Sequence, residues 1–356
     1  MNIEERLIAL TLDLYSKGQT DFKLRESGTL FEISNSGSRV FKESWQSQDY
    51  LSAEQYLFRM IPHRLEAFRK NPINSIDAGV YVGEKRVRVV LCRSHAGREM
   101  TVRILPEAIP SVAQLNLPPQ VIQRFREERN GMILFVGETG SGKTTANAAL
   151  YQDRFAYRTK GGGLVTLEDP VEYVHPETDR LWVSQMELGN QFTSYRSALR
   201  IAMRMHPTDI LQQEIRMEQD EETGKMVSSA SHAVNTAMSG HLLCSSYHAA
   251  DPIGGVIRIV GEMRDSGVAD AAGMVCSVLR MVIACRLMSN ATDTSKVAIH
   301  EVLMVNDTIA SILRDGIQKG NTNEVRRKID TNSDGCQSFG ESTRRAVMAG
   351  LLKHTM

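Results

Sequence analysis

Residues 137–144, GETGSGKT, have the spacing G-x-x-x-x-G-K-S/T and lie between the apolar run 132–136 and a helix-forming run. Glycines at these positions let the backbone take positive φ and turn its N–H groups inward, and a helix start adds its positive end. This pattern is typical of a loop that binds nucleotide phosphates. We expect Lys143 to reach the β- and γ-phosphates and the Thr144 hydroxyl to bind Mg²⁺. The expected nucleotide-binding residues are Gly137, Glu138, Thr139, Gly140, Ser141, Gly142, Lys143, Thr144 and Thr145.

Carboxylates follow two other predicted strands. Glu168 begins an acidic stretch, residues 168–173, directly after the apolar run 164–167, and Glu214 follows the apolar pair at 210–211. A carboxylate beside a phosphate loop can hold Mg²⁺ or orient the attacking water. A solvated acidic turn is the alternative for residues 168–173 and stays open from this stretch alone.

Two histidines, His241 and His248, bracket the predicted strand 242–247. In an extended segment they lie at opposite ends and on opposite sides, so they cannot form one metal site directly. They are candidates for phosphate sensing, and a structural role for each imidazole is the alternative.

These residues need a sheet to position them. From residue 132 onward, apolar strands alternate with helices, which predicts parallel strands with a nucleotide site beyond their carboxyl ends. We expect residues 252–356 to be mainly helical, with a buried helix at 271–279 and one strand at 297–303. Before that region, a helix at 3–16, a hairpin at 22–34, a helix at 52–70 broken at Pro62, and strands at 86–91 and 100–105 indicate a small α+β domain.

Composition excludes several classes of protein. Lys+Arg and Asp+Glu both number 42 and the pI is about 7.1, so no overall field attracts nucleic acid or an anionic membrane. The five cysteines are odd in number and contain no C-x-x-C, which argues against a disulfide framework and a zinc cluster and favours a reducing cytosol. The N-terminus lacks a basic-then-apolar signal region, and the longest apolar stretch, 271–279, is too short to span a bilayer.

The four segments, in this order, resemble the secretion ATPase superfamily, which comprises the type II and type IV secretion and type IV pilus motor ATPases, including PilT-like motors. Residues 137–144 are similar to its Walker A loop, 166–173 to its Asp box, 209–216 to its atypical Walker B segment and 240–248 to its His box. Upstream, Arg88 and Arg103 match the arginines on two N-terminal strands that reach the nucleotide in this family.

The resemblance implies an α/β fold, with a smaller N-terminal α+β (PAS-like) domain over residues 1–108 and a RecA-like P-loop ATPase domain over 109–356. It further implies ATP and Mg²⁺ as ligands, a homo-hexamer, and an inner-membrane platform protein as partner, with peripheral membrane attachment and no direct contact with nucleic acid. By the same resemblance, Glu214 is the general base and Glu168 a second carboxylate for water or Mg²⁺. His241 and His248 are γ-phosphate or inter-subunit sensors.

Some residues depart from the family pattern. The usual glycine before the Walker B glutamate is Gln213, the usual aspartate after its arginine is Met217, and the threonine usual after the second histidine is Ala249. Residues 217–225 look like an acidic insertion, which is either inert or a partner contact. These departures favour a conjugal transfer or type IVB secretion member. The alternatives are a type IV pilus retraction or assembly motor, a nucleic-acid translocase, and a nucleotide-binding scaffold that does not hydrolyse ATP.

Overall fold

The computed structural model describes residues 2–33, 39–71, 75–220, 223–290, 292 and 295–353. Its chain forms two compact units. The first comprises Met1–Ala108 with the short segments Asp169–Val174 and Glu187–Gln191, and the second contains the remainder, from Ile109 onward. The two segments lie within the range 109–356 expected for the second domain, so the compact units and the expected sequence ranges differ there. Each unit is described by itself.

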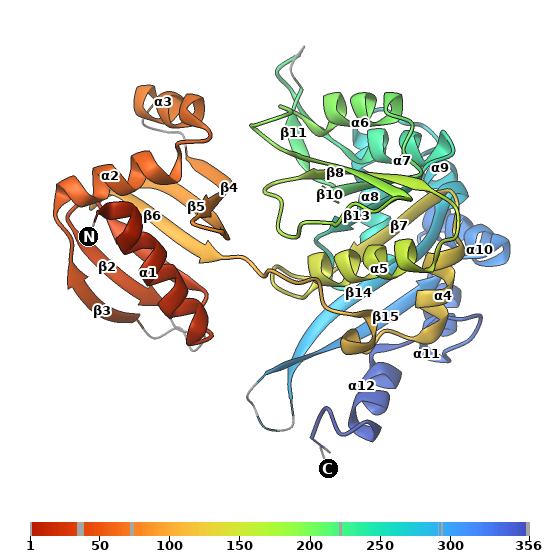
Figure 1. The fold of residues 1–356 in the computed structure, drawn as a ribbon. Coiled ribbons are helices and arrows are strands. Elements are labelled where there is room, and N and C mark those ends of the chain that lie inside the picture. Colours follow the sequence, from red (N-terminus) through yellow and green to blue (C-terminus); the bar gives the residue numbers. More distant parts are fainter. Residues whose placement is uncertain are drawn as a thin grey trace. The chain divides into compact units, whose positions relative to one another are not determined.

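The first unit is an antiparallel sheet with the strand order β3-β2-β1-β6-β5-β4. Three helices pack their apolar residues against it, and Leu7, Phe22 and Val89 belong to the shared core (Figure 1). The strands are β1 (Asp21–Arg25), β2 (Thr29–Ile33), β3 (Arg39–Ser44), β4 (Ile76–Val82), β5 (Lys85–Ser94) and β6 (Gly97–Ile104). The helices are α1 (Ile3–Ser16), α2 (Ser47–Leu57) and α3 (Pro62–Lys70).

The predicted elements of this unit are present, and two strands were missed. The hairpin expected at 22–34 is β1 and β2, although residue 34 lies outside the described residues, and Pro62 begins a new helix as expected. The sequence analysis missed β3 and β4. In β4, buried residues alternate with half-buried or exposed ones, but Ala78 and Gly79 weaken that alternation as a sequence signal.

The second unit contains a seven-stranded sheet with the order β15-β14-β7-β13-β10-β8-β9 (Figure 1). The strands from β14 to β8 pair in parallel, as predicted, and β15 pairs antiparallel to β14. Their bounds are β7 (Gly131–Val136), β8 (Gly162–Glu168), β9 (Leu181–Glu187), β10 (Asp209–Glu214), β13 (Leu242–Tyr247), β14 (Leu279–Ser289) and β15 (Lys296–Met304). A separate hairpin is formed by β11 (Met217–Gln219) and β12 (Met226–Ser228).

Helices cover both faces of this sheet. Ile133 and Phe135 of β7 share a core with residues of α4 and α5, whereas Val136 packs against Gly255 of α8. The helical elements are η1 (Val112–Leu115), α4 (Pro119–Glu127), α5 (Lys143–Tyr157), α6 (Tyr195–Arg204), α7 (Ala230–Met238), α8 (Pro252–Asp265), α9 (Ala271–Val278), α10 (Asp307–Lys319), α11 (Asn323–Asp330) and α12 (Phe339–Met348). All six residues of β7 are buried, as expected for a central parallel strand.

The region after residue 252 is mainly helical, and the strand expected at 297–303 is β15, but the expectation of a single strand there was wrong. The buried helix α9 is present, but it ends at Val278, and Leu279 begins the strand β14, which pairs with β7 and β15. A continuous apolar run does not reveal by its periodicity where a buried helix gives way to a buried strand. In the part of the chain that is described, no helix is long and apolar enough to cross a membrane.

Candidate active site

Four candidate segments lie at one edge of the second sheet. The strands β7, β13, β10 and β8 are neighbours and run parallel, so their carboxyl ends meet along that edge (Figure 1). The glycine loop follows β7, His248 follows β13, Glu214 ends β10 and Glu168 ends β8. This is the edge at which parallel α/β sheets bind ligands.

The glycine loop has the backbone expected of a phosphate cradle. Gly137, Gly140 and Gly142 have φ values of 149°, 76° and 93°. At Gly137 a Cβ atom would lie 2.5 Å from Ser141 Oγ and 2.7 Å from the Cys285 carbonyl oxygen, so only glycine fits. Gly142 precedes α5 in the left-handed conformation and has no side chain that could cap that helix.

The polar groups of the loop fit a bound phosphate. Lys143 Nζ lies 2.8 Å from the carbonyl oxygens of Gly137 and Glu138, so the ammonium is held against the loop. Ser141 Oγ is buried and has no hydrogen-bond partner in the part of the chain that the structure describes. The start of α5, the Lys143 ammonium and the Ser141 hydroxyl lie close together in this loop. The loop therefore offers several hydrogen-bond donors to a bound anion.

Glu214 and His248 meet across β10 and β13. Glu214 Oε1 is 2.9 Å from His248 Nε2, and the two side chains are 29% and 47% exposed. Solvent therefore reaches both groups. The sequence analysis proposed roles for the two residues separately, and the structure brings them into contact.

A β-bulge precedes Glu214. Gln212 pairs with Ser245 and Glu214 with Ser246, so Gln213 is the extra residue between them. Gln213 is not among the residues with positive φ, and its carbonyl oxygen accepts a 2.6 Å hydrogen bond from Ser246 Oγ. The bulge therefore does not require the glycine that is usual in the resembled family.

Glu168 is buried and not part of a solvated turn. Its Oε1 accepts hydrogen bonds from Thr166 Oγ1 at 2.6 Å and Gln185 Nε2 at 3.1 Å. The carboxylates that follow it, Asp169 and Glu172, belong to the first compact unit. The acidic stretch is thus divided between the two units, and Glu168 lies at the same sheet edge as Glu214 within the second unit.

His241 lies at the other end of its strand. It precedes β13, and its carbonyl oxygen accepts from the N–H of Gly131, where β7 begins. Its ring contacts Ser239 Oγ at 3.0 Å, and burial and the nearby His206 lower its pKa. Within one chain, His241 is therefore not at the phosphate-loop edge, and only an inter-subunit role remains as a prediction.

Arg88 and Arg103 are direct partners in the register of β5 and β6 in the first unit, so their side chains share a face of that sheet. The Arg88 guanidinium donates to Asp77 Oδ1 at 2.8 Å, and hydrogen bonding to Asp77 raises the pKa of Arg88. Arg103 Nε pairs with Asp21 at 2.7 Å. Both arginines are held by carboxylates of their own unit, and contact with a nucleotide stays a prediction.

The sequence analysis missed the residues that support the site. Gln212 and Ser229 are buried beside Glu214, and Asp209 at the start of β10 is buried with Arg154. Gln212 could have been noticed in the sequence, because a polar residue directly follows the apolar pair at 210–211 of a predicted strand. No local pattern marks the Asp209–Arg154 pair, because its two residues are far apart in the sequence.

Fold and site together define a P-loop ATPase of RecA-like architecture. Residues 72–354 match the family described as Type II/IV secretion system protein, and the chain belongs to that family. It is an ATPase, as the members of this family are.

Several relatives show the range of this family. The chain is 29% identical over 268 residues to the "Twitching motility protein" of Neisseria gonorrhoeae, covering 75% of this chain and 67% of that protein. It is 29% identical over 281 residues to "Uncharacterized protein YggR" of Escherichia coli, with coverage of 78% and 80%. It is 28% identical over 276 residues to "Type IV pilus ATPase PilU" of Pseudomonas aeruginosa, with coverage of 76% and 66%.

Two solved structures share the fold. The Legionella pneumophila ATPase DotB superposes with a TM-score of 0.76 at 20% identity, covering 99% of this chain and 94% of that one. The pilus retraction motor PilT with bound ADP superposes with a TM-score of 0.77 at 23% identity, covering 98% and 94%.

Proposed function

We propose that this protein is a homo-hexameric motor that hydrolyses ATP to power a type IV secretion or conjugal transfer apparatus at the cytoplasmic face of the inner membrane. The observation that carries the hydrolytic part is the pair of Glu214 and His248, 2.9 Å apart at the same sheet edge as the phosphate loop. A carboxylate that solvent reaches, beside a phosphate cradle, is suited to orient and deprotonate an attacking water.

Each residue has a defined part in this proposal. The backbone of residues 137–145 and Lys143 bind the phosphates, and Glu214 acts as the general base. Thr144 would hold Mg²⁺, with Glu168 as a second ligand directly or through water, and the ion would supply positive charge toward the phosphates. His248 orients Glu214 through their contact and senses the γ-phosphate.

The N-terminal region supplies the coupling in this proposal. Residues 1–108 act as one domain and residues 109–356 as the other, and Arg88 and Arg103 neutralise charge on the transferring phosphoryl group only when the domains close. Both arginines now contact Asp77 or Asp21, so closure exchanges those carboxylates for the nucleotide. Hydrolysis then depends on domain movement, and movement on hydrolysis.

The choice of apparatus rests on sequence departures. Gln213, Met217 and Ala249 differ from the pattern of the pilus motors, which favours a conjugal transfer or type IVB role with an inner-membrane platform protein as partner. The second candidate is a type IV pilus retraction or assembly motor, favoured by the names of two relatives. A deletion strain that loses DNA or effector transfer but keeps twitching supports the first, and the reverse phenotype supports the second.

The first experiment is steady-state ATPase activity with solution mass, for wild type, Lys143→Ala and Glu214→Gln, with and without Mg-ATP. We expect wild type to turn over as a hexamer, Lys143→Ala to lose nucleotide binding, and Glu214→Gln to bind nucleotide while losing at least about 100-fold in kcat. A ring that binds ATP without hydrolysing it would replace the motor with a scaffold. Strong stimulation by DNA that falls steeply with salt would indicate a translocase.

A further inference from the structure

The backbone that carries Glu214 is held from both sides. On the β13 side, the Ile215 N–H donates to the Ser246 carbonyl oxygen at 2.9 Å, in addition to the bond from Ser246 Oγ to Gln213. On the other side, Gln212 Nε2 donates to the Glu214 carbonyl oxygen at 3.0 Å. Because Gln213 bulges out of the ladder, these bonds replace the regular pairing that would otherwise fix this segment.

Gln212 is unusual for its position. Its side chain is fully buried and follows the apolar Ile210 and Leu211, and its Oε1 has no hydrogen-bond partner among the described residues. Burying an amide oxygen without a partner is unfavourable, and an apolar side chain would avoid this cost. Its amide nitrogen must face the Glu214 carbonyl oxygen, since a carbonyl only accepts. The two bonds made by Nε2 are therefore what the glutamine contributes.

Ser229 receives the second bond. Its Oγ lies 2.8 Å from Gln212 Nε2 and accepts from the Arg216 N–H at 3.1 Å, while the Ser229 N–H donates to the Arg216 carbonyl oxygen at 3.0 Å. Ser229 precedes α7, but its side chain does not cap that helix. The hydroxyl serves the end of β10 instead.

We propose that Gln212 and Ser229 are positioning residues that fix the backbone of residues 214–216 and so keep the Glu214 carboxylate against His248. This inference rests on the proposed role of Glu214 as the general base. A shift of about 1 Å in a reacting group can lower a rate by up to about 100-fold. Losing the bond from Gln212 frees the carbonyl of Glu214 itself, and losing the Ser229 hydroxyl removes the second partner of Gln212 Nε2 and the acceptor of the Arg216 N–H.

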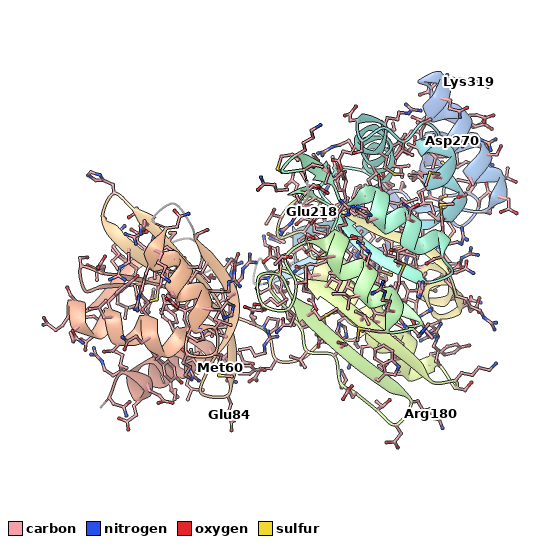
Figure 2. All side chains as sticks on the ribbon, turned by 90° about the horizontal axis from the view of Figure 1, so that it is seen from above. Met60, Glu84, Arg180, Glu218, Asp270 and Lys319 are labelled. Atoms are coloured by element: carbon pink, nitrogen blue, oxygen red, sulfur yellow. The ribbon has the colours of Figure 1, made fainter. Side chains whose placement is uncertain are left out.

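The bonds that Gln212 and Ser229 make to residues 214–216, called the clamp below, also close the β11–β12 hairpin at its base. Arg216 and Ser229 flank the hairpin and pair through both backbone and side chain. Glu218, which is labelled in Figure 2, accepts a hydrogen bond from the Tyr195 N–H and so ties the hairpin to α6. The predicted insertion at 217–225, of which residues 221 and 222 lie outside the described residues, therefore meets the active site through its base.

The test compares Gln212→Met and Ser229→Ala with wild type, because both substitutions remove the bonds with little change in volume. We expect each to lower kcat about tenfold while the affinity for a fluorescent ATP analogue changes by less than about twofold. Since both residues act through one contact, the double variant should fall no more than about twofold below the slower single variant. Ser229→Thr keeps the hydroxyl and should restore most of the rate.

Thr236→Val is the matched control. Thr236 is buried on α7, the helix that Ser229 precedes, and its hydroxyl donates to the His232 carbonyl oxygen at 2.8 Å within that helix. This variant should keep kcat within about twofold of wild type. An equal loss in Thr236→Val, or loss of nucleotide affinity in the clamp variants, would show a general packing role and overturn the inference.

The Glu214→Gln variant separates this inference from the proposed function. If Glu214→Gln is inactive and the clamp variants keep the wild-type kcat, the positioning role alone fails. If Glu214→Gln turns over at the wild-type rate, the base assignment fails and the positioning role fails with it. Slow clamp variants together with an inactive Glu214→Gln support both.

Discussion

Asp209 begins the strand that ends in Glu214, and two arginines enclose its carboxylate. Arg154 Nε lies 2.8 Å from Oδ1 with both side chains fully buried, and Arg158 lies 2.9 Å from Oδ2. The Arg154 guanidinium also donates to the Glu128 carbonyl oxygen at 2.6 Å. This network connects α5, which starts at the phosphate loop, with the amino end of β10.

Removing the carboxylate should destabilise the protein strongly. Asp209→Ala leaves a buried guanidinium without its counter-charge, and loss of one partner from a buried pair costs about 3–5 kcal/mol of unfolding free energy. Urea denaturation of the second unit's transition measures this change. Asp153→Ala removes a more exposed pair with Arg126, at 2.7 Å, and should cost about 1 kcal/mol or less. Equal losses in the two variants would contradict the argument.

Among the elements, the β11–β12 hairpin has a definite structural role. Glu218 accepts hydrogen bonds from the backbone N–H groups of Tyr195 and Arg196, at 2.8 and 3.1 Å, which are the first two residues of α6. Asp220 pairs with the Arg196 side chain. A carboxylate at a helix start satisfies free donors and opposes the helix dipole.

Glu218→Ala should therefore loosen the first turn of α6. Loss of such a cap costs about 1 kcal/mol, so amide hydrogen exchange at Tyr195 and Arg196 should accelerate about fivefold. Gln219→Ala on the same hairpin is the control, because Gln219 donates to Gly224 within the hairpin and makes no bond to α6 among those described. Unchanged exchange in Glu218→Ala would show that solvent replaces the cap without loss.

The sequence predicted the phosphate loop and the central parallel strands better than the neighbouring strand and the side chains that support the site. The phosphate loop and the parallel strands have strong local patterns, and the structure places Glu214, Glu168 and His248 at one edge as the strand order requires. The strand β14 was missed because its apolar run continues from α9. Gln212 and Ser229 were missed because a side-chain bond between residues 17 positions apart leaves no periodic signal.

At the scale of the whole molecule, buried histidines lower the unfolding free energy at acidic pH. His175 lies beside Tyr151 in the second unit, and burial lowers its pKa to about 4. His300 on β15 is also buried, and burial lowers its pKa to about 4. The unfolded chain binds a proton at each ring near the usual value of 6.5, whereas the folded chain does so only near 4.

Unfolding free energy should therefore fall as the pH drops from about 6.5 to about 4, because protons then favour the unfolded state. For one ring the loss by pH 4 is roughly 3 kcal/mol. His175→Phe keeps an aromatic ring beside Tyr151 and should reduce the fall by about that amount, as measured by urea denaturation at pH 7 and at pH 4. Parallel pH dependences in wild type and His175→Phe would contradict this prediction.

The residues at the N-termini of the helices influence where the second unit can bind an anion. Side chains of the protein occupy the starts of α6, α8, α9 and α10, through Ser194 with Glu218, Asp251, Asp270 and Asn306. At α5 the residue before the helix is Gly142, which brings no competing oxygen. A phosphate group that binds the second unit thus competes with acceptors of the protein at those four helices. At α5 the N-cap residue is a glycine, so it supplies no competing side chain. A phosphate group is thus favoured at α5 over those four helices in part because the chain has already satisfied their N-termini itself.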